Sequence, residues 1–140
     1  MNQDFTQKMV IIINRELPSW QAMNAVAHIS AYLGHRIHQY FDTGEYFVTK
    51  DKINHPRNSQ YAIIILGANP GQMAHIMQKV RNSGLLYHGF IREMIETTDD
   101  SEVQAMLSEK NDSEVEYLGI GVFGPIPQVD AVSKNYSLWK

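Results

Sequence analysis

The run from Met9 to Ile13 constrains this chain more than any other stretch of its sequence. It reads Met-Val-Ile-Ile-Ile, and consecutive β-branched residues are typical of a strand that is covered on both faces. Such a strand requires packed layers above and below it. Pro18 and Ser19 then indicate a helix start, with Ser19 as the expected N-cap. The helical pattern continues from Trp20 to Leu33, and Gly34 supplies the stop.

The rest of the chain alternates in the same way between strand and helix patterns. Strands are expected at 61–66, 85–95 and 115–123, a short strand at 45–49, a helix from Asn69-Pro70 to Ser83, a short surface helix within 99–113, and one helical turn within 128–140. This alternation predicts an α/β fold, namely a three-layer sandwich whose mixed, mostly four-stranded sheet has helices on both faces. A length of 140 residues suits a single domain spanning residues 1–140.

Composition and charge exclude several classes of site. There is no cysteine, which rules out disulfides, thiolate metal sites and a cysteine nucleophile. The 12 Lys+Arg against 15 Asp+Glu give a net charge of −3, which disfavours nucleic acid, tRNA included, as a tightly bound partner. No apolar run reaches the ~18–20 residues that span a bilayer, so we expect no membrane association and a cytoplasmic location.

Four segments resemble the type-II peptidyl-tRNA hydrolases, and especially the uncharacterised, domain-of-unknown-function branch of that family. The closing segment is the most specific match, because it resembles the family's "LGIGPGP…ID-x-VTG-x-L-x-L" ending. The matching segments are KMVIIINREL, the helix that ends on Ala27-His28, YAIIILGANPGQMAHIMQKVRNSGLL and LGIGVFGPIPQVDAVSKNYSLWK. Together they leave only about 36–58 and 99–113 unmatched.

The resemblance also implies site residues, which transfer to this chain one at a time. In the family, a Lys on the first helix, a Gln one turn later, and an Asp-x-x-x-Thr pair after the third strand are associated with activity. Here Gln21 stands at the Lys position and Ala25 at the Gln position. The acidic residue and the hydroxyl are Glu93 and Thr97, and Glu96 replaces the Arg before the Thr.

These replacements change the chemistry that the family site can support. Hydrolysis of a peptidyl-tRNA ester requires stabilisation of an oxyanion and a grip on phosphate. Gln21 can donate a hydrogen bond but cannot neutralise charge. Glu96 reverses the charge beside the site and repels phosphate.

Several residues admit both a functional and a structural interpretation. His28 is either a general acid/base or a satisfied structural histidine on a small-residue helix. Glu93 and Thr97 are either a base with an orienting hydroxyl or solvated residues at a strand end, and the retained spacing favours a site. Asn24 either lines a pocket or bonds to nearby backbone.

Cofactor and metal sites are not expected. The residues from Gly119 to Gly124 spell G-x-G-x-x-G, but a dinucleotide loop must lead from a strand into a helix, and this motif lies inside a strand. Close approach of backbone is the favoured interpretation. His35 and His38 lie three residues apart without a third ligand at a persuasive spacing.

Three hypotheses about function follow from the sequence. The first is a cleft at the first strand–helix junction that binds a small molecule or peptide. The second is an active peptidyl-tRNA hydrolase or esterase, and the third is a protein-interaction module, such as a homodimer. The predicted catalytic residues are Glu93, Thr97 and His28, and the predicted ligand-binding residues are Arg15, Gln21 and Asn24.

Overall fold

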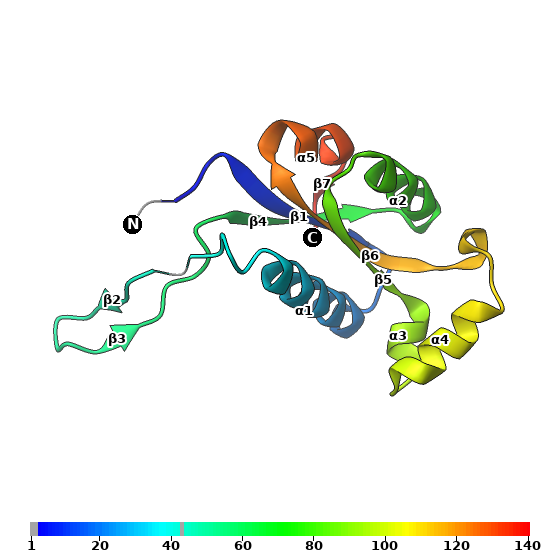
Figure 1. Ribbon diagram of the computed structural model, residues 1–140, viewed down its shortest axis with the longest axis horizontal. Helices are drawn as coiled ribbons and strands as arrows, with labels where there is room; N and C mark the ends of the chain where they lie inside the picture. Colours follow the sequence, from blue (N-terminus) through cyan, green and yellow to red (C-terminus); the bar gives the residue numbers. More distant parts are fainter. Residues whose placement is uncertain (1–2, 43) are drawn as a thin grey trace.

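Strand β1 (Gln7–Asn14) lies at the centre of a five-stranded sheet (Figure 1). The structure, a computed structural model, describes residues 3–42 and 44–140. β1 pairs in parallel with β4 (Ala62–Ala68) and antiparallel with β6 (Tyr117–Pro125). Its residues from Val10 to Ile13 are each 1% exposed or less, which confirms the prediction of a strand covered on both faces.

Two further strands complete the sheet, in the order β5-β6-β1-β4-β7. β5 (Leu86–Ile91) runs antiparallel to β6, and β7 (Ser137–Leu138) runs antiparallel to β4. The mixed sheet is confirmed, but the expectation of a mostly four-stranded sheet is wrong. The tail turns back after its helix and adds a short fifth strand, whose Leu138 is paired with Leu66.

Helices cover both faces of the sheet. α1 (Ser19–Arg36) packs on one face, and α2 (Met73–Asn82) and α5 (Ile126–Ser133) pack on the other. The central strand serves both cores, because alternate side chains of a strand point to opposite faces. Thus Ile11 packs with α1, and Ile12 packs with α2 and α5. The remaining helical segments are η1 (Pro70–Gln72), α3 (Arg92–Glu96), α4 (Asp100–Ser108) and η2 (Asp112–Glu114).

Several helix boundaries differ from the sequence expectations. Ser19 is the first helical residue of α1 rather than its cap, and Pro18 stands at the N-cap position. The strand expected at 85–95 ends at Ile91, where α3 begins. The tail forms an eight-residue helix rather than one turn, because the proline at its first turn favours helix initiation. The expected core stripe of α2 is confirmed, and its buried residues are Met73, Ile76, Met77 and Val80.

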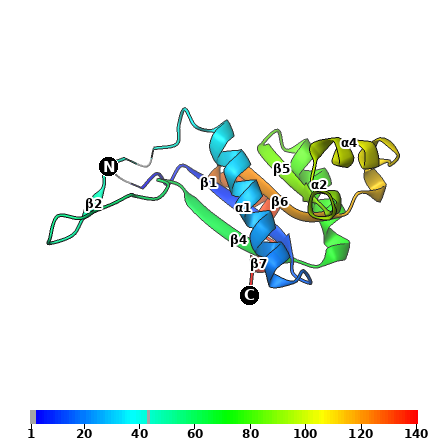
Figure 2. The ribbon, with the colours of Figure 1, turned by 90° about the horizontal axis from the view of Figure 1, so that it is seen from below.

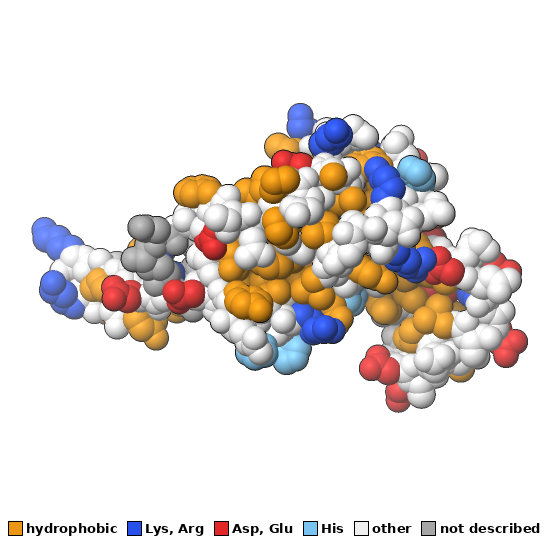
Figure 3. Space-filling view, turned by 45° about the horizontal axis from the view of Figure 1, so that its top comes forward, with side chains coloured by type: hydrophobic (Ala, Val, Ile, Leu, Met, Phe, Trp, Pro, Cys, Tyr) orange, Lys and Arg blue, Asp and Glu red, His pale blue; other side chains and the backbone are white. Residues whose placement is uncertain are grey.

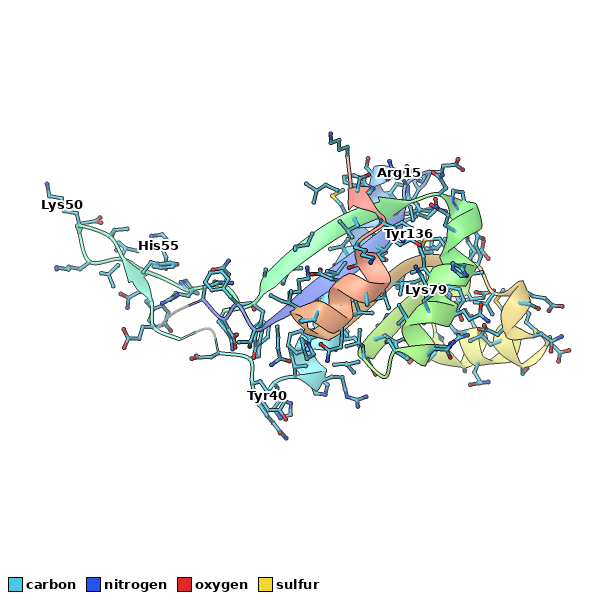
Figure 4. All side chains as sticks on the ribbon, turned by 90° about the horizontal axis from the view of Figure 1, so that it is seen from above. Arg15, Tyr40, Lys50, His55, Lys79 and Tyr136 are labelled. Carbon is cyan, nitrogen blue, oxygen red and sulfur yellow. The ribbon has the colours of Figure 1, made fainter. Side chains whose placement is uncertain are left out.

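An extended arm, residues 44–58, projects from the body of the molecule (Figures 1 and 2). It carries a small hairpin of β2 (Phe47–Val48) and β3 (Asn54–His55), so the strand expected at 45–49 is shorter than predicted. Lys50 and His55 lie on this arm, far from Arg15 on the body (Figure 4). Among the described helices, none is long and apolar enough to cross a membrane.

Two glycines of β6 allow α1 to lie directly on the sheet. A Cβ atom at Gly119 would come within 2.9 Å of the side chains of Ile13 and Ile29, and one at Gly121 would overlap Ile29 Cγ2. The G-x-G-x-x-G sequence therefore serves close approach between helix and strand, as expected.

Replacement of Gly121 by alanine should destabilise the fold, because the added methyl group overlaps the Ile29 side chain. We expect a loss of about 1–3 kcal/mol in the free energy of unfolding, measured by urea denaturation. Gly34→Ala is the matched control. No atom lies within 4 Å of its added Cβ, and helix propensity predicts a gain of about 0.5–1 kcal/mol. Equal effects of the two substitutions would contradict this account of the packing.

Candidate functional site

A cleft of about 420 Å³ opens between α1, β5 and the loop that joins α3 to α4. His28 and Tyr32 lie four residues apart on α1 and therefore on one face of the helix. His88 and Phe90 lie two residues apart on β5 and therefore on one face of the strand. The cleft is lined by His28, Ala31, Tyr32, His88, Phe90, Met94, Thr97, Thr98, Asp99, Asp100 and Val103.

Paired rings form the inner wall of the cleft. The ring of His28 stacks on that of Phe90, with centroids 5.5 Å apart and an interplanar angle of 14°. The rings of Tyr32 and His88 lie 4.7 Å apart and are tilted by 50°. Both imidazoles are therefore held against aromatic rings at the cleft surface.

The environment of His88 favours its neutral form. Burial lowers the pKa of His88, and the nearby His28 lowers it further. Its Nδ1 atom is buried and has no hydrogen-bond partner among the described residues. A neutral imidazole offers one nitrogen as a donor and the other as an acceptor, so His88 can take a hydrogen bond or a proton from a ligand.

Hydroxyl and carboxylate groups form the outer wall. The Thr97 hydroxyl donates to the backbone carbonyl of Glu93 at 2.8 Å, which leaves its oxygen available as an acceptor. Asp99 caps α4 by accepting from the backbone N–H of Ser101 at 2.8 Å, and this interaction lowers the pKa of Asp99. Asp100 is exposed at the start of the same helix.

The lining is acidic as a whole. Within the described part of the chain, no Lys or Arg side chain lines the cleft, whereas two aspartates do. Anions are repelled by such a surface, and cations or hydrogen-bond donors are attracted to it.

Glu93 lies beneath this wall rather than in it. The residue is 1% exposed, and one of its carboxylate oxygens is 2.5 Å from Lys110 Nζ. Burial raises the pKa of Glu93, but the hydrogen bond and the charge of Lys110 outweigh burial, so the pKa lies below its ordinary value. Its other oxygen is buried without a hydrogen-bond partner among the described residues. Glu93 therefore anchors the chain after α4 to α3.

Gln21 lies beside a cation. Its side-chain oxygen accepts a hydrogen bond from Arg92 at 3.0 Å, and Arg92 also forms an ion pair with Glu116 at 2.9 Å. The positive charge next to Gln21 is thus balanced by a carboxylate from the start of β6.

Arg15 and Asn24 lie outside the cleft. Arg15 donates to the backbone carbonyl of Gly67 at 2.8 Å and to the Ser137 hydroxyl at 3.2 Å, so it ties the turn after β1 to β4 and β7 (Figure 4). Asn24 is exposed on α1. Of the six residues predicted for the site, the structure brings His28 and Thr97 together at the cleft surface.

Sequence reasoning missed most of the lining. Tyr32 follows His28 by one helical turn, and this spacing is a readable signal. The alternation of His88 and Phe90 on a strand is another. Asp99 and Asp100 fall in the short surface helix expected within 99–113, and nothing in their local sequence indicates which residues they would oppose.

No metal centre is formed by the part of the chain that the structure describes, because it brings no three metal-ligating side chains together. The rings of His35 and His38 stack with centroids 6.0 Å apart.

Acidification should destabilise the protein through His88. Its pKa in the folded state lies below the ordinary 6.5, so the unfolded chain binds more protons as the pH falls through that value. The free energy of unfolding should therefore decline from pH 7 to pH 5. His88→Gln should reduce this decline in urea denaturation, whereas His55→Gln on the arm should leave it unchanged. An undiminished decline in His88→Gln would contradict the assignment.

Comparisons with known proteins place this chain in a family. The model for "Protein of unknown function (DUF2000)" matches residues 7–140. Among solved structures, the chain is similar to the protein of unknown function Atu0240 from Agrobacterium tumefaciens. The two share 18% sequence identity with a TM-score of 0.83, over 96% of this chain and 98% of that chain, which shows a common fold alone. No protein with a curated description matches significantly. Because the family model spans nearly the whole chain, the protein belongs to the DUF2000 family.

Proposed function

We propose that the cleft binds a small organic molecule, or the end of a peptide, that carries a positively charged amine beside a flat apolar group. The observation that carries this proposal is the lining itself. It combines two aspartates with aromatic rings and contains no Lys or Arg among the described residues.

Each part of the lining has a role in this proposal. Asp100, exposed at the edge, attracts the ammonium group, and Asp99 adds a second negative charge. The half-buried Tyr32 ring and the exposed His28 ring, which stacks on the buried Phe90, accept the apolar part of the ligand.

Charge around Thr97 argues against tRNA as the substrate. Asp99 and Asp100 follow it closely, and Glu96 precedes it. A phosphate that approached Thr97 would meet these carboxylates without a cation from the lining to offset them. Arg92, beside Gln21, is already engaged by Glu116.

Hydrolysis of an ester or amide is the second candidate function. The observation in its favour is that His28, His88 and the Thr97 hydroxyl face one cleft. A histidine with a lowered pKa is available as a general base at neutral pH. In this version, Glu93 supports Thr97 from below, since the Thr97 hydroxyl is bonded to the Glu93 backbone.

Titration with 2-phenylethylamine tests the binding proposal. We expect saturable NMR shifts at the amides of Thr97 and Thr98 and at the His88 ring. Asp100→Asn should raise the dissociation constant about fivefold, because it removes one charge from an exposed pair. 3-Phenylpropionate, which has the same ring and the opposite charge, should cause no saturable shift.

The matched control for this titration is Asp51→Asn, the same chemical change at an exposed position on the distant arm. It should leave the dissociation constant unchanged. Equal binding of the amine and the carboxylate would overturn the proposal, as would shifts that leave the cleft residues unmoved.

Hydrolysis of a peptidyl-tRNA at low salt separates the two candidates. We expect no cleavage by the wild-type chain, because the cleft repels phosphate. Cleavage by wild type that is abolished in Thr97→Ala and kept in Thr98→Ala would instead establish the hydrolase. Both hydroxyls line the cleft, so Thr98→Ala is a close control.

A further inference from the structure

The arm exposes several apolar side chains, although Arg57 lies over the Phe47 ring, 4.9 Å from its centroid. Phe47 is 55% exposed, Val48 56% and Ile53 55%. Phe47 pairs with His55 across the hairpin, and Val48 pairs with Asn54. Because side chains alternate along a strand, Phe47 and Val48 lie on opposite faces of the arm. The arm is therefore apolar on both sides.

A hairpin of this size is not expected to hold its shape alone. Its two strands contain two residues each, and an isolated two-stranded hairpin is marginal in water. Three or more strands, or packing against another element, are needed for stability. We therefore expect the arm to pack against another surface.

The same chain carries an apolar groove of about 330 Å³ beside α1. It exists because α1 packs over β1, β6 and β5 and leaves the same face of β4 uncovered, so that Ile63 is 43% exposed. Met23 on the rim of the groove is 64% exposed. The groove is lined by Ile13, Ala22, Met23, Val26, Ala27, Ile65 and Trp139, none of which lines the acidic cleft.

We propose that two copies of this chain form a two-fold dimer in which the arm of each copy lies in the apolar groove of the other. The Phe47–Ile53 face of the arm fills the groove. The occupant is a second copy, because each chain carries both an apolar arm and an apolar groove. In a two-fold dimer, both arms and both grooves are covered at once.

The charges of the molecule agree with this arrangement. The arm lies at one end of the long axis, α1, which borders the groove, lies nearer the middle, and α4 lies at the other end (Figure 1). Two copies whose long axes run antiparallel bring the arm of each onto the groove of the other. The arm tip, with Lys50 and Lys52, then points toward the partner's acidic α4 end. Figure 3 shows basic side chains at the arm tip and acidic ones at the opposite end.

The surfaces that would meet are mostly apolar, and the Arg57 guanidinium, which would be buried with Phe47, already lies over the ring of that residue. All groove-lining residues are apolar, and so are Phe47 and Ile53. Each partner contributes one arm and one groove, so the two-fold arrangement buries this apolar contact twice.

The mass in solution is the first test. Sedimentation equilibrium should give twice the 16.0 kDa of the chain at high concentration and a shift toward monomer on dilution. Phe47→Asp and Met23→Asp should each raise the dimer dissociation constant about tenfold or more, because each puts a charge into the apolar contact. Tyr87→Asp, at a partly exposed aromatic on β5 outside the proposed interface, should leave it unchanged.

Cross-linking identifies the contact directly, because the natural chain has no cysteine. A Phe47→Cys protein mixed with a size-tagged Met23→Cys protein should form a mixed disulfide on mild oxidation. Phe47→Cys mixed with a tagged Gln128→Cys protein, whose cysteine lies exposed on α5, should not.

Two outcomes overturn the proposal. One is a monomer at every concentration. The other is a dimer that survives both aspartate substitutions and forms no Phe47–Met23 mixed disulfide, which would locate the interface elsewhere. Neither outcome bears on the amine-binding proposal, since the cleft and the groove share no residue.

Discussion

The contact between α1 and β6 determines the rest of this structure. Ile29 of α1 rests where Gly119 and Gly121 leave β6 without side chains, and this brings the helix down onto the sheet. With α1 over β1, β5 and β6, the cleft forms along one side of the helix, where His28 meets Phe90. On the other side of the helix, α1 does not cover β4, and the apolar groove forms there. The placement of α1 on the sheet thus produces both surfaces for which a function is proposed.

The sequence could predict those parts of the fold that a local pattern of apolar residues determines. The run around Ile11 required cover on both faces, and the stripe of α2 specified its buried side; both are confirmed. The fifth strand could not be read, because β7 is two residues long and exists only by pairing with a strand some seventy residues earlier. The candidate site divides in the same way. Spacing drew attention to His28 and Thr97, whereas the ring pairs and the aspartates opposite them depend on tertiary placement.

The position of Gln21 shows why a residue matched to another family by resemblance alone has to be interpreted together with its neighbours. Considered by itself, the neutral Gln21 side chain lacks the positive charge of the Lys that the resemblance leads one to expect. In the fold, Arg92 donates a hydrogen bond to Gln21, so a cation does stand at this point, although Glu116 balances it. The charge at this point is thus set by side chains from three separate segments of the chain. Any activity at this point would therefore depend on Gln21, Arg92 and Glu116 together rather than on one of them.

The two walls of the cleft are attached to the protein by different forces. The α1 wall belongs to the hydrophobic core, whereas α4 has no fully buried residue and is held by half-buried Val103 and Leu107 and by the Lys110–Glu93 ion pair. Segments with few buried apolar contacts open locally at a lower free energy than the whole domain. The outer wall of the cleft should therefore open more readily than the wall formed by α1. If the cleft binds a ligand as proposed, partial detachment of this wall gives the ligand a route in while the sheet stays intact.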